Sequence, residues 1–425
     1  MSTLNQANIS ILLDFGGSFI KSAVVQRGRR ELENILTFPT PPFLANHEKL
    51  KVIPVNALIR VIDEAIGGQA KFAPKASRIF ISGQMGGYVI LNDQEFEVIS
   101  WQDERALLEA NSEKYRSIYS SLDKSTEFKR TGSELRPGLP IVSIAVSSSE
   151  GNDTNLYQPF RSLISFVTSY LTDFECDEMH VTDAAASGFF DIYSNQWDQK
   201  LTALAGNRFK FPKVYGDIKR LGLSKKYNLE VFCGVGDQQA SLLGAGLDSE
   251  NLVVNIGTGG QVAGLNGSTE TTGNYQIRPY FGGEKIRTIT HLPSGRALKA
   301  FVEFAFGKNV GSSDYESFAK MAGDENIAEL IDVSNYEKTL KELSELGNAK
   351  DIAKLASSFF YSLIEIYAKS IADLELSGSL IFAGGVGQKV GIIALGISEK
   401  TSRNYFISNS DETTLAGLAL LSENV

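Results

Sequence analysis

Apolar and polar positions alternate at the start of the chain in a pattern typical of β-structure. Residues 9–26, ISILLDFGGSFIKSAVVQ, form an apolar run, a glycine turn and a second alternating run, which predicts a β-hairpin with polar groups at its tip. We expect a third strand at residues 31–38, a helix over residues 55–68 that ends at its glycines, and a β-branched strand at residues 77–83. Together these elements predict an α/β lobe.

The same pattern returns far downstream, which indicates an internal duplication. Residues 251–266, NLVVNIGTGGQVAGLN, again read as a strand, a Gly-rich tip and a returning strand. A helix with one apolar face is expected over residues 351–374, followed by a buried strand. We therefore predict an N-terminal lobe over residues 1–247 and a C-terminal lobe over residues 248–425.

Length and charge agree with two lobes and exclude some partners. The chain has 425 residues and 43% apolar content, whereas a single core rarely grows beyond about 250 to 300 residues. Its net charge of -9 repels a phosphate backbone, so no nucleic-acid partner is expected. The polar segments 113–160 and 305–350 are interpreted only as surface insertions with short helices.

Compartment can also be judged from the sequence. Cys176 and Cys233 are widely spaced and give neither a disulfide framework nor a zinc site. The polar N-terminus lacks the features of a signal peptide, and no apolar run approaches the roughly 18 residues that cross a bilayer. We expect a cytoplasmic protein without a membrane partner, and leave open whether it forms a homodimer.

The first hairpin tip carries groups that suit phosphate binding. Gly16 and Gly17 let the backbone approach a phosphate and aim N–H groups at it, beside Ser18. Asp14, at the end of the strand, is a candidate to hold hydrated Mg²⁺. The alternative is an ordinary tight hairpin. Lys21 is either a solvated strand residue or a helper to the phosphates.

A second Gly-rich tip strengthens the phosphate hypothesis, because two such tips can clamp a triphosphate from opposite sides. This tip contains Gly257, Thr258 and Gly259. Gly384 and Gly385 follow the late buried strand, where the absence of side chains would leave a flat surface for an adenine ring. An ordinary strand-to-helix turn is the alternative there.

Asp237 follows a glycine turn and opens a helix between the two halves of the chain. Its default role is to cap that helix, but its position would also place a carboxylate in a cleft that faces both tips. Phosphoryl transfer needs one group to accept the proton of the attacking hydroxyl, and Asp237 is our candidate. Gln238 could hydrogen-bond the substrate beside it.

A further polar cluster contains Trp101, Asp103 and Arg105. An aromatic plane with an acid and a guanidinium is a common way to bind a sugar. The alternative is that Asp103 caps the following helix and Arg105 lies on the surface. Gln84 and Met85 form either a pocket wall or a plain loop. No Walker A loop, G-x-S-x-G elbow or Rossmann fingerprint is present.

These segments, in order and over nearly the whole chain, resemble the FGGY family of carbohydrate kinases within the actin-like and hexokinase-like ATPase superfamily. The first phosphate motif is similar to DFGGSFIK, the sugar-site turn to SGQMGG, the Trp-x-Asp-x-Arg sugar motif to WQDER, and the catalytic segment to GVGDQQASLLGAG. The second phosphate and adenosine motifs resemble NIGTGG and FAGGVG. The resemblance implies an α/β fold of two actin-like (ribonuclease H-like) ATPase lobes with a cleft between them.

Carried over by position, the resemblance implies an ATP- and Mg²⁺-dependent kinase for a small sugar. Asp237 would be the general base, Asp14 and Asp237 the metal-associated acids, and Trp101, Asp103 and Arg105 sugar contacts. The segments SGQM, WQDER and GEKIRTITHLPSGRALKAFVEF look most like those of sedoheptulokinases. That likeness implies phosphorylation of a terminal hydroxyl of sedoheptulose to give sedoheptulose 7-phosphate.

Three positions depart from the family pattern. Gly17 stands where threonine is usual, Gly86 stands where ketose kinases often have a histidine, and the adenosine motif lacks its asparagine. Alternatives therefore stay open: a kinase for a pentulose or polyol such as xylulose, ribulose or glycerol, a sugar-independent actin-like ATPase, or a sugar sensor.

Overall fold

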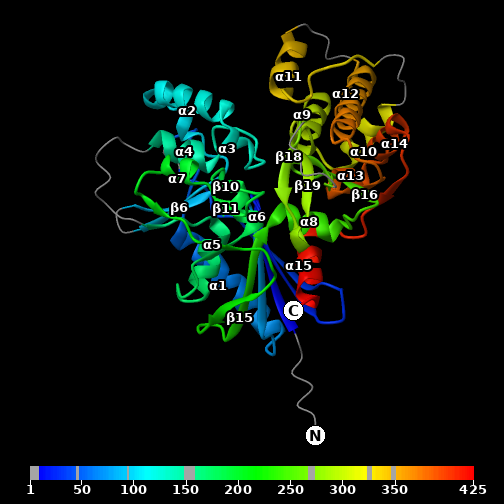
Figure 1. Ribbon diagram of the computed structural model, residues 1–425. Helices are drawn as coiled ribbons and strands as arrows, with labels where there is room; N and C mark the ends of the chain where they lie inside the picture. Colours follow the sequence, from blue (N-terminus) through cyan, green and yellow to red (C-terminus); the bar gives the residue numbers. More distant parts are fainter. Residues whose placement is uncertain are drawn as a thin grey trace.

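The computed structural model describes residues 9–44, 47–92, 95–147, 158–266, 273–322, 328–345 and 351–425. Within them the chain forms two six-stranded mixed sheets, one in each half, with helices packed on both (Figure 1). This confirms the predicted α/β fold of two actin-like lobes. Parts of the two polar segments, at residues 148–157, 323–327 and 346–350, lie outside the described residues.

The first sheet has the order β14-β15-β5-β1-β2-β3. Its strands are β1 (Ile9–Phe15), β2 (Phe19–Gln26), β3 (Glu33–Pro39), β5 (Arg78–Gly83), β14 (Arg220–Ser224) and β15 (Leu229–Gly236). β1 and β2 pair antiparallel with Phe15 opposite Ile20, so the predicted hairpin is confirmed. β5 and β15 run parallel to β1, which brings their carboxyl ends to the same edge as the hairpin tip.

The second sheet repeats this arrangement in the order β18-β19-β17-β16-β20-β21. Its strands are β16 (Asn251–Ile256), β17 (Gly260–Leu265), β18 (Gln276–Pro279), β19 (Lys285–Leu292), β20 (Ser379–Ala383) and β21 (Tyr405–Ile407). The β16–β17 hairpin corresponds to β1–β2, and β20 and β21 run parallel to β16 as β5 and β15 do to β1. The internal duplication is therefore present in three dimensions.

Accessory elements fill the first lobe. They are β4 (Val52–Pro54), α1 (Val55–Phe72), β6 (Tyr88–Asn92), β7 (Glu95–Ile99), η1 (Arg105–Leu107), η2 (Glu109–Asn111), α2 (Ser112–Lys124), α3 (Thr126–Lys129), α4 (Pro140–Ser147), β8 (Gln158–Pro159), α5 (Leu163–Leu171), β9 (Glu178–His180), α6 (Val181–Ala184), η3 (Ala185–Ser187), β10 (Phe190–Asp191), β11 (Gln196–Trp197), α7 (Gln199–Ala203), β12 (Phe209–Lys210) and β13 (Lys213–Tyr215). Helices α1 and α5 cover one face of the first sheet and share its core. A separate aromatic core, centred on Phe160, Phe189 and Phe190, supports the insertion that carries Trp101.

The remaining helices begin at the lobe boundary and continue to the end of the chain. They are α8 (Asp237–Ala245), η4 (Phe281–Gly283), α9 (Gly295–Phe306), α10 (Ser312–Met321), α11 (Tyr336–Glu345), α12 (Ile352–Asp373), α13 (Gly384–Lys389), α14 (Gly391–Thr401) and α15 (Thr413–Glu423). On the predicted apolar face of α12, Phe359 and Leu363 are buried in the core of the second lobe. None of the described helices has the length and apolar character needed to span a membrane.

One predicted helix boundary is wrong. The helix expected to end at Gly67 and Gly68 continues as α1 to Phe72, immediately before Ala73 and Pro74. The glycines serve packing instead, since a Cβ on Gly68 would lie 2.8 Å from the Leu36 side chain. Proline, which disfavours helical backbone in the residue before it, marks the real end.

The last helix, α15, returns to the first lobe and packs against the second face of its sheet (Figure 1). Leu415 and Leu418 of α15 share a buried cluster with Leu12 and Phe80 of the first sheet. α15 also crosses α8 closely, because a Cβ on Gly417 would stand 1.9 Å from the Ala240 carbonyl oxygen. The proposed division near residue 247 thus separates the two sheets, while α15 packs with the first.

Candidate active site

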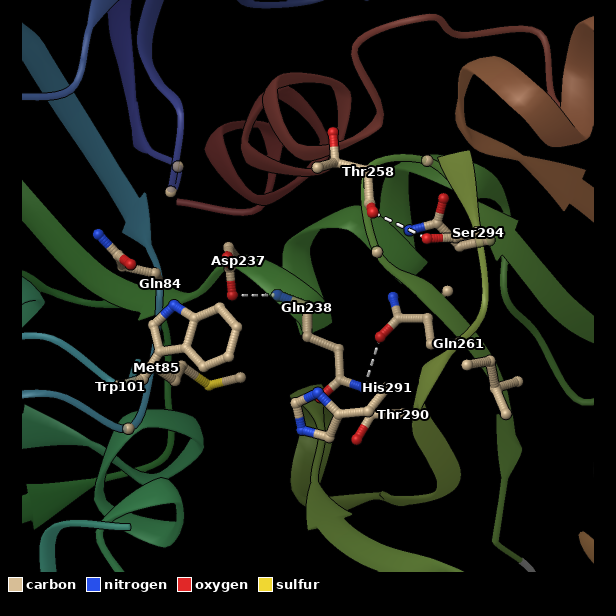
Figure 2. Close-up of a pocket in the computed structure, with 18 of the residues that line it drawn as sticks. Gln84, Met85, Trp101, Asp237, Gln238, Thr258, Gln261, Thr290, His291 and Ser294 are labelled. Carbon is tan, nitrogen blue, oxygen red and sulfur yellow. Dashed lines mark hydrogen bonds between the residues drawn. The ribbon is translucent and has the colours of Figure 1, made fainter. Parts of the chain in front are cut away.

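A cavity of about 660 Å³ lies between the two lobes and is lined from both of them (Figure 2). Most of the site residues predicted from sequence line it: Asp14, Gly16, Gly17, Ser18, Lys21, Gln84, Met85, Trp101, Asp237, Gln238, Gly257, Thr258 and Gly259. Asp103, Arg105, Gly384 and Gly385 are not among its lining residues. The fold therefore gathers side chains from five distant segments into one space.

The first tip is a tight hairpin closed by the Gly16 N–H, which donates to the Phe19 carbonyl at 3.0 Å. A Cβ on Gly16 would lie 2.8 Å from that same oxygen, so the turn requires glycine. A Cβ on Gly17 would meet no protein atom closer than 4.0 Å. Gly17 therefore leaves open space in the cavity lining, close to exposed backbone.

Asp14 stands at the end of β1, beneath this tip. Ser82 at the end of β5 donates its hydroxyl to Asp14 Oδ1 at 2.8 Å. Burial raises the pKa of Asp14 to about 6, although the Ser82 hydrogen bond and Lys21 act in the opposite direction. Such a carboxylate lacks a full counter-charge and would gain from a cation in the cavity.

The second tip is held by its neighbours in the C-terminal lobe. The Gly257 N–H donates to the Gly259 carbonyl at 3.0 Å, and the Gly295 N–H donates to the Gly257 carbonyl at 3.0 Å. Ser294 donates its hydroxyl to the Thr258 carbonyl at 2.8 Å (Figure 2). A Cβ on Gly259 would meet nothing within 4 Å, so this tip, like the first, leaves room for a ligand.

The predicted adenine surface lies behind the second tip. Gly384 opens α13 with a φ of +78°, and a Cβ there would stand 2.8 Å from the Gly257 nitrogen. Glycine at position 384 therefore supports the tip through close backbone packing. Gly385 has open space beside it, and its contact with a nucleotide remains a prediction. Tyr336, from a segment that the sequence left unassigned, does line the cavity.

Asp237 is the first residue of α8 and lies between the two groups of cavity-lining elements (Figure 2). Gly236 is the actual N-cap, and Asp237 Oδ1 accepts a hydrogen bond from the Gln238 N–H at 2.8 Å. Burial, reinforced by the charge of Asp14, raises the pKa of Asp237 to about 7. A carboxylate with this pKa can exchange a proton near neutral pH.

Gln238 links the lobes. Its side-chain amide nitrogen donates to Gln261 Oε1 of β17 at 2.9 Å (Figure 2). The same nitrogen donates to Thr288 Oγ1 of β19 at 3.0 Å. The predicted substrate contact would have to use its other atoms, because these donors are occupied. Gln239 makes a second link by donating to the Pro279 carbonyl at 3.1 Å.

Trp101 forms one wall of the cavity beside Met85 and Gln84 (Figure 2). The Gln84 N–H donates to the Phe15 carbonyl at 2.9 Å, which ties this wall to the first tip. His291 of the second lobe lies opposite, with its ring centre 6.0 Å from that of Trp101. Nothing in the local sequence pattern around His291 indicates a position in the cavity.

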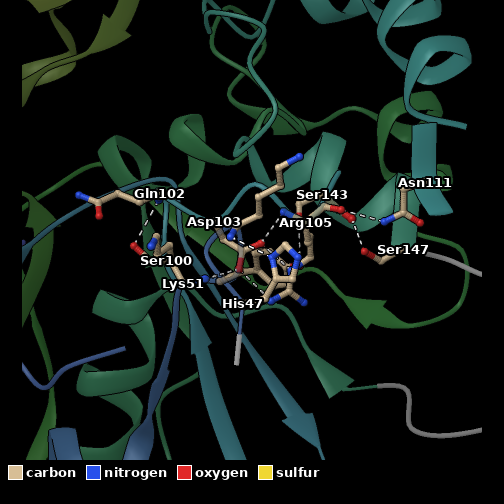
Figure 3. A network of polar contacts seen from close by, with 11 residues as sticks. His47, Lys51, Ser100, Gln102, Asp103, Arg105, Asn111, Ser143 and Ser147 are labelled. Carbon is tan, nitrogen blue, oxygen red and sulfur yellow. Dashed lines mark hydrogen bonds and ion pairs between the residues drawn. The ribbon is translucent and has the colours of Figure 1, made fainter. Parts of the chain in front are cut away.

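Asp103 and Arg105 are not among the residues that line the cavity, and their sugar contacts remain a prediction. Arg105 Nε lies 2.7 Å from Asp103 Oδ1, and the Lys51 N–H donates to Asp103 Oδ2 at 2.8 Å (Figure 3). The Asp103 side chain is 1% exposed. Each group is already paired within the loop that presents Trp101, so the pair fixes that loop from behind.

Lys21 is not a solvated strand residue, because it forms an ion pair across the chain. Its Nζ lies 2.6 Å from Glu412 Oε2, just before α15. Both side chains are about one-quarter exposed, at 28% and 26%. Lys21 therefore connects the first hairpin to the C-terminal helix at the rim of the cavity, where it also lies within range of the Asp14 charge.

Solved structures of sugar kinases are similar to the whole chain. Xylulose kinase from Rhodospirillum rubrum matches with a TM-score of 0.83 at 14% identity, covering 97% of this chain and 89% of that one. Gluconate kinase from Lactobacillus acidophilus (TM-score 0.80) and Plasmodium falciparum glycerol kinase with ADP (TM-score 0.77) each match at 14% identity, covering 98% of this chain and 89% of theirs. No curated protein sequence matches.

Such low sequence identity shows only that the fold is shared. A match to a family model is what shows the family. The N-terminal domain model of the FGGY family of carbohydrate kinases matches residues 9–248. The chain belongs to the FGGY family. As an FGGY carbohydrate kinase it is an enzyme, and the residues 9–248 that match include the first tip, Trp101 and Asp237.

Proposed function

We propose that this FGGY kinase transfers the γ-phosphoryl group of ATP to a terminal hydroxyl of a polyhydroxy substrate bound beside Trp101, with Asp237 as general base. The observation that carries the proposal is the position of Asp237 in one cavity with both Gly-rich tips and with Trp101. A base must lie within reach of the reacting hydroxyl, and phosphate and sugar must meet there.

Asp237 suits this role electrostatically as well as by position. Burial and Asp14 raise its pKa to about 7, so at neutral pH it can accept the proton of the attacking hydroxyl as the new bond forms. Its orientation is fixed by α8, whose next two residues are bonded to the second lobe through Gln261, Thr288 and Pro279. When the lobes close, Asp237 would therefore move together with the second lobe.

Carboxylate side chains and two Gly-rich tips line the cavity, which supports the binding of a magnesium nucleotide. Mg²⁺ is usually bound through one or two carboxylates together with substrate phosphates. Asp14 and Asp237 would be those carboxylates, and the tips at Gly17 and Gly259 would receive the phosphates. Mg²⁺ would neutralise charge on the transferring phosphoryl group.

The identity of the substrate is less narrowly defined than the type of reaction. Sedoheptulose is the candidate given by the segment resemblance, with xylulose, ribulose and glycerol as alternatives. Similar structures are of xylulose, gluconate and glycerol kinases, so the panel to test spans ketoses, sugar acids and polyols. The cytoplasmic location and the homodimer remain predictions.

A coupled ADP-release assay tests this proposal. We expect little turnover with MgATP alone and strong stimulation by one compound of the panel. Sugar-independent hydrolysis would favour an actin-like ATPase instead, and sugar binding without turnover would favour a sensor. Omission of Mg²⁺ should abolish the stimulated rate.

A further inference from the structure

Two arginine side chains, for which the sequence predicts no role, line the cavity together with Trp101 and His291. Arg136 comes from the polar insertion of the first lobe, and Arg278 comes from β18 of the second. Both lie close enough to His291 for their charges to lower its pKa, together with burial. They therefore belong to one end of the cavity although they are on different lobes.

Arg136 is held in place by Trp101. Its Nη1 donates to the Trp101 carbonyl at 2.9 Å, and the guanidinium lies 5.5 Å from the centre of the indole. A Cβ on Gly86 would stand 2.9 Å from Arg136 Nη2. The guanidinium thus occupies the space that a side chain at position 86 would take, which gives this departure from the ketose-kinase pattern a physical meaning.

Arg278 is held by a neutral partner. Its Nε donates to Gln276 Oε1 at 2.9 Å, and the amide of Gln276 donates to Glu134 Oε2 at 2.8 Å. Among the described residues neither Arg136 nor Arg278 forms an ion pair with a carboxylate, although the Glu134 carboxylate lies close enough to act electrostatically on both. Burial and the charge of Arg136 lower the pKa of Arg278 to about 10.

This arrangement holds two guanidinium groups near each other in a partly buried space, with the half-exposed Glu134 as a shared counter-charge. A second anion bound between them would therefore lower the free energy of the cluster. An arginine fork matches a planar carboxylate with two parallel hydrogen bonds. Donor positions beyond those used for Trp101 and Gln276 remain on both guanidinium groups, which have five N–H bonds each. The site is therefore complementary to a carboxylate.

The phosphoryl groups of a nucleotide are the other anions that could enter, but the tips that would receive them lie elsewhere. Asp14, beneath the first tip, acts electrostatically on Asp237. The charges that act on Arg278 are those of Arg136, Glu134 and Asp237. Arg136 is bonded to Trp101 and Arg278 to Gln276, and among the described residues neither arginine forms a hydrogen bond with either tip.

We propose that the substrate of this kinase is a polyhydroxy acid, whose carboxylate is bound by Arg136 and Arg278 while a hydroxyl at its other end faces Asp237. The proposal rests on the proposed kinase function and would replace the neutral heptulose with an aldonate-type substrate. In the transfer, the hydroxyl oxygen forms a bond to the γ-phosphorus, the bond to ADP breaks, and the hydroxyl proton passes to Asp237.

Matched compounds that differ only at one end test the proposal. Gluconate and xylonate would be compared with glucitol and xylitol, together with sedoheptulose, xylulose and a sugar phosphate, in the ADP-release assay. We expect kcat/KM for an acid to exceed that for its matched polyol by about tenfold or more. Equal or better turnover of the neutral compounds would overturn the proposal and leave the kinase function intact. Preference for the sugar phosphate would also overturn it.

Substitution of the two arginines tests whether they cause this preference for the acid. Arg136→Gln and Arg278→Gln should each raise KM for the acid by about tenfold to a hundredfold, the usual effect of losing a charged hydrogen bond, and change KM for neutral compounds by less than about threefold. Arg60→Gln, on the exposed face of α1, is the matched control. An equal loss for acids and neutral compounds would show that the arginines act on the phosphoryl group, against the proposal.

Calorimetric binding without nucleotide separates this inference from the catalytic one. The acid should bind the wild-type protein and not Arg136→Gln, with Arg136→Lys restoring part of the affinity and thermal melting showing that each variant is folded. If no compound were phosphorylated, the kinase function would fail. Arginine-dependent acid binding would then still support the carboxylate site, and its absence would refute it.

Discussion

Arg105 donates two hydrogen bonds to Asp103, from Nε to Oδ1 at 2.7 Å and from Nη2 to Oδ2 at 3.1 Å. This pair lies directly behind the loop that presents Trp101. Because this pair is buried, Asp103→Ala would leave the Arg105 charge without its partner. We expect a loss of about 3 kcal/mol in the free energy of unfolding, measured by urea denaturation. The exposed neighbour Glu104, changed to Ala, is the control. A large rise in KM without loss of stability would instead support Asp103 as a sugar contact.

Asp237→Asn keeps the shape of the proposed base but removes its ability to accept a proton. We expect kcat to fall by about a hundredfold to ten-thousandfold, while the substrate still binds, because the arginines and Trp101 are untouched. Single-turnover assays and calorimetry on the same preparation measure the two effects. Turnover near the wild-type rate would show that another group is the base.

The partly buried charge of Asp237 also makes stability depend on pH. Its folded-state pKa of about 7 lies above the ordinary value of 3.8, so the folded protein holds this proton more firmly than the unfolded chain. The contribution to stability is therefore present at low pH and is lost as pH rises towards 7 and beyond.

Asp237→Asn should remove that dependence. Without Mg²⁺ or nucleotide, we expect the variant to be more stable than the wild type by about 2 kcal/mol at pH 8, and the difference to vanish near pH 4. Urea denaturation at four pH values measures it. A difference that is constant with pH would contradict the assigned burial of the charge.

The crossing of α8 and α15 leaves no room for a methyl group. A Cβ on Gly417 would stand 1.9 Å from the Ala240 carbonyl, so Gly417→Ala should lower the free energy of unfolding by about 3 kcal/mol. Gly67→Ala in α1, where a Cβ meets nothing within 4 Å, should raise it by about 0.5 to 1 kcal/mol. Similar effects of the two changes would contradict the close crossing.

The local pattern of apolar and polar residues was sufficient to predict the hairpins, their Gly-rich tips and the neighbouring helices. Strand alternation around Gly16 and Gly257 and the apolar face of α12 are properties of neighbouring residues, and both lobes followed from them. The pairing of Asp103 with Arg105 could not be predicted, because motif spacing places Asp103 near Trp101 in sequence but does not say which face of the loop it takes.

Arg136, Arg278 and His291 were missed for a related reason. They come from a weakly periodic insertion and from strands whose alternation reports only a sheet, and they meet solely because the two lobes face each other. Contacts between residues of different lobes depend on how the two lobes are placed relative to each other. No local signal in the sequence contains that information.

The return of α15 to the first lobe has a consequence for biosynthesis. Leu12 and Phe80 emerge early from the ribosome, yet the side chains that cover them, Leu415 and Leu418, are among the last to be made. This part of the first sheet's apolar face therefore stays without the cover of α15 until the entire second lobe has been synthesised. Nascent chains that stop before residue 413 should be the forms that chaperones retain and proteases remove.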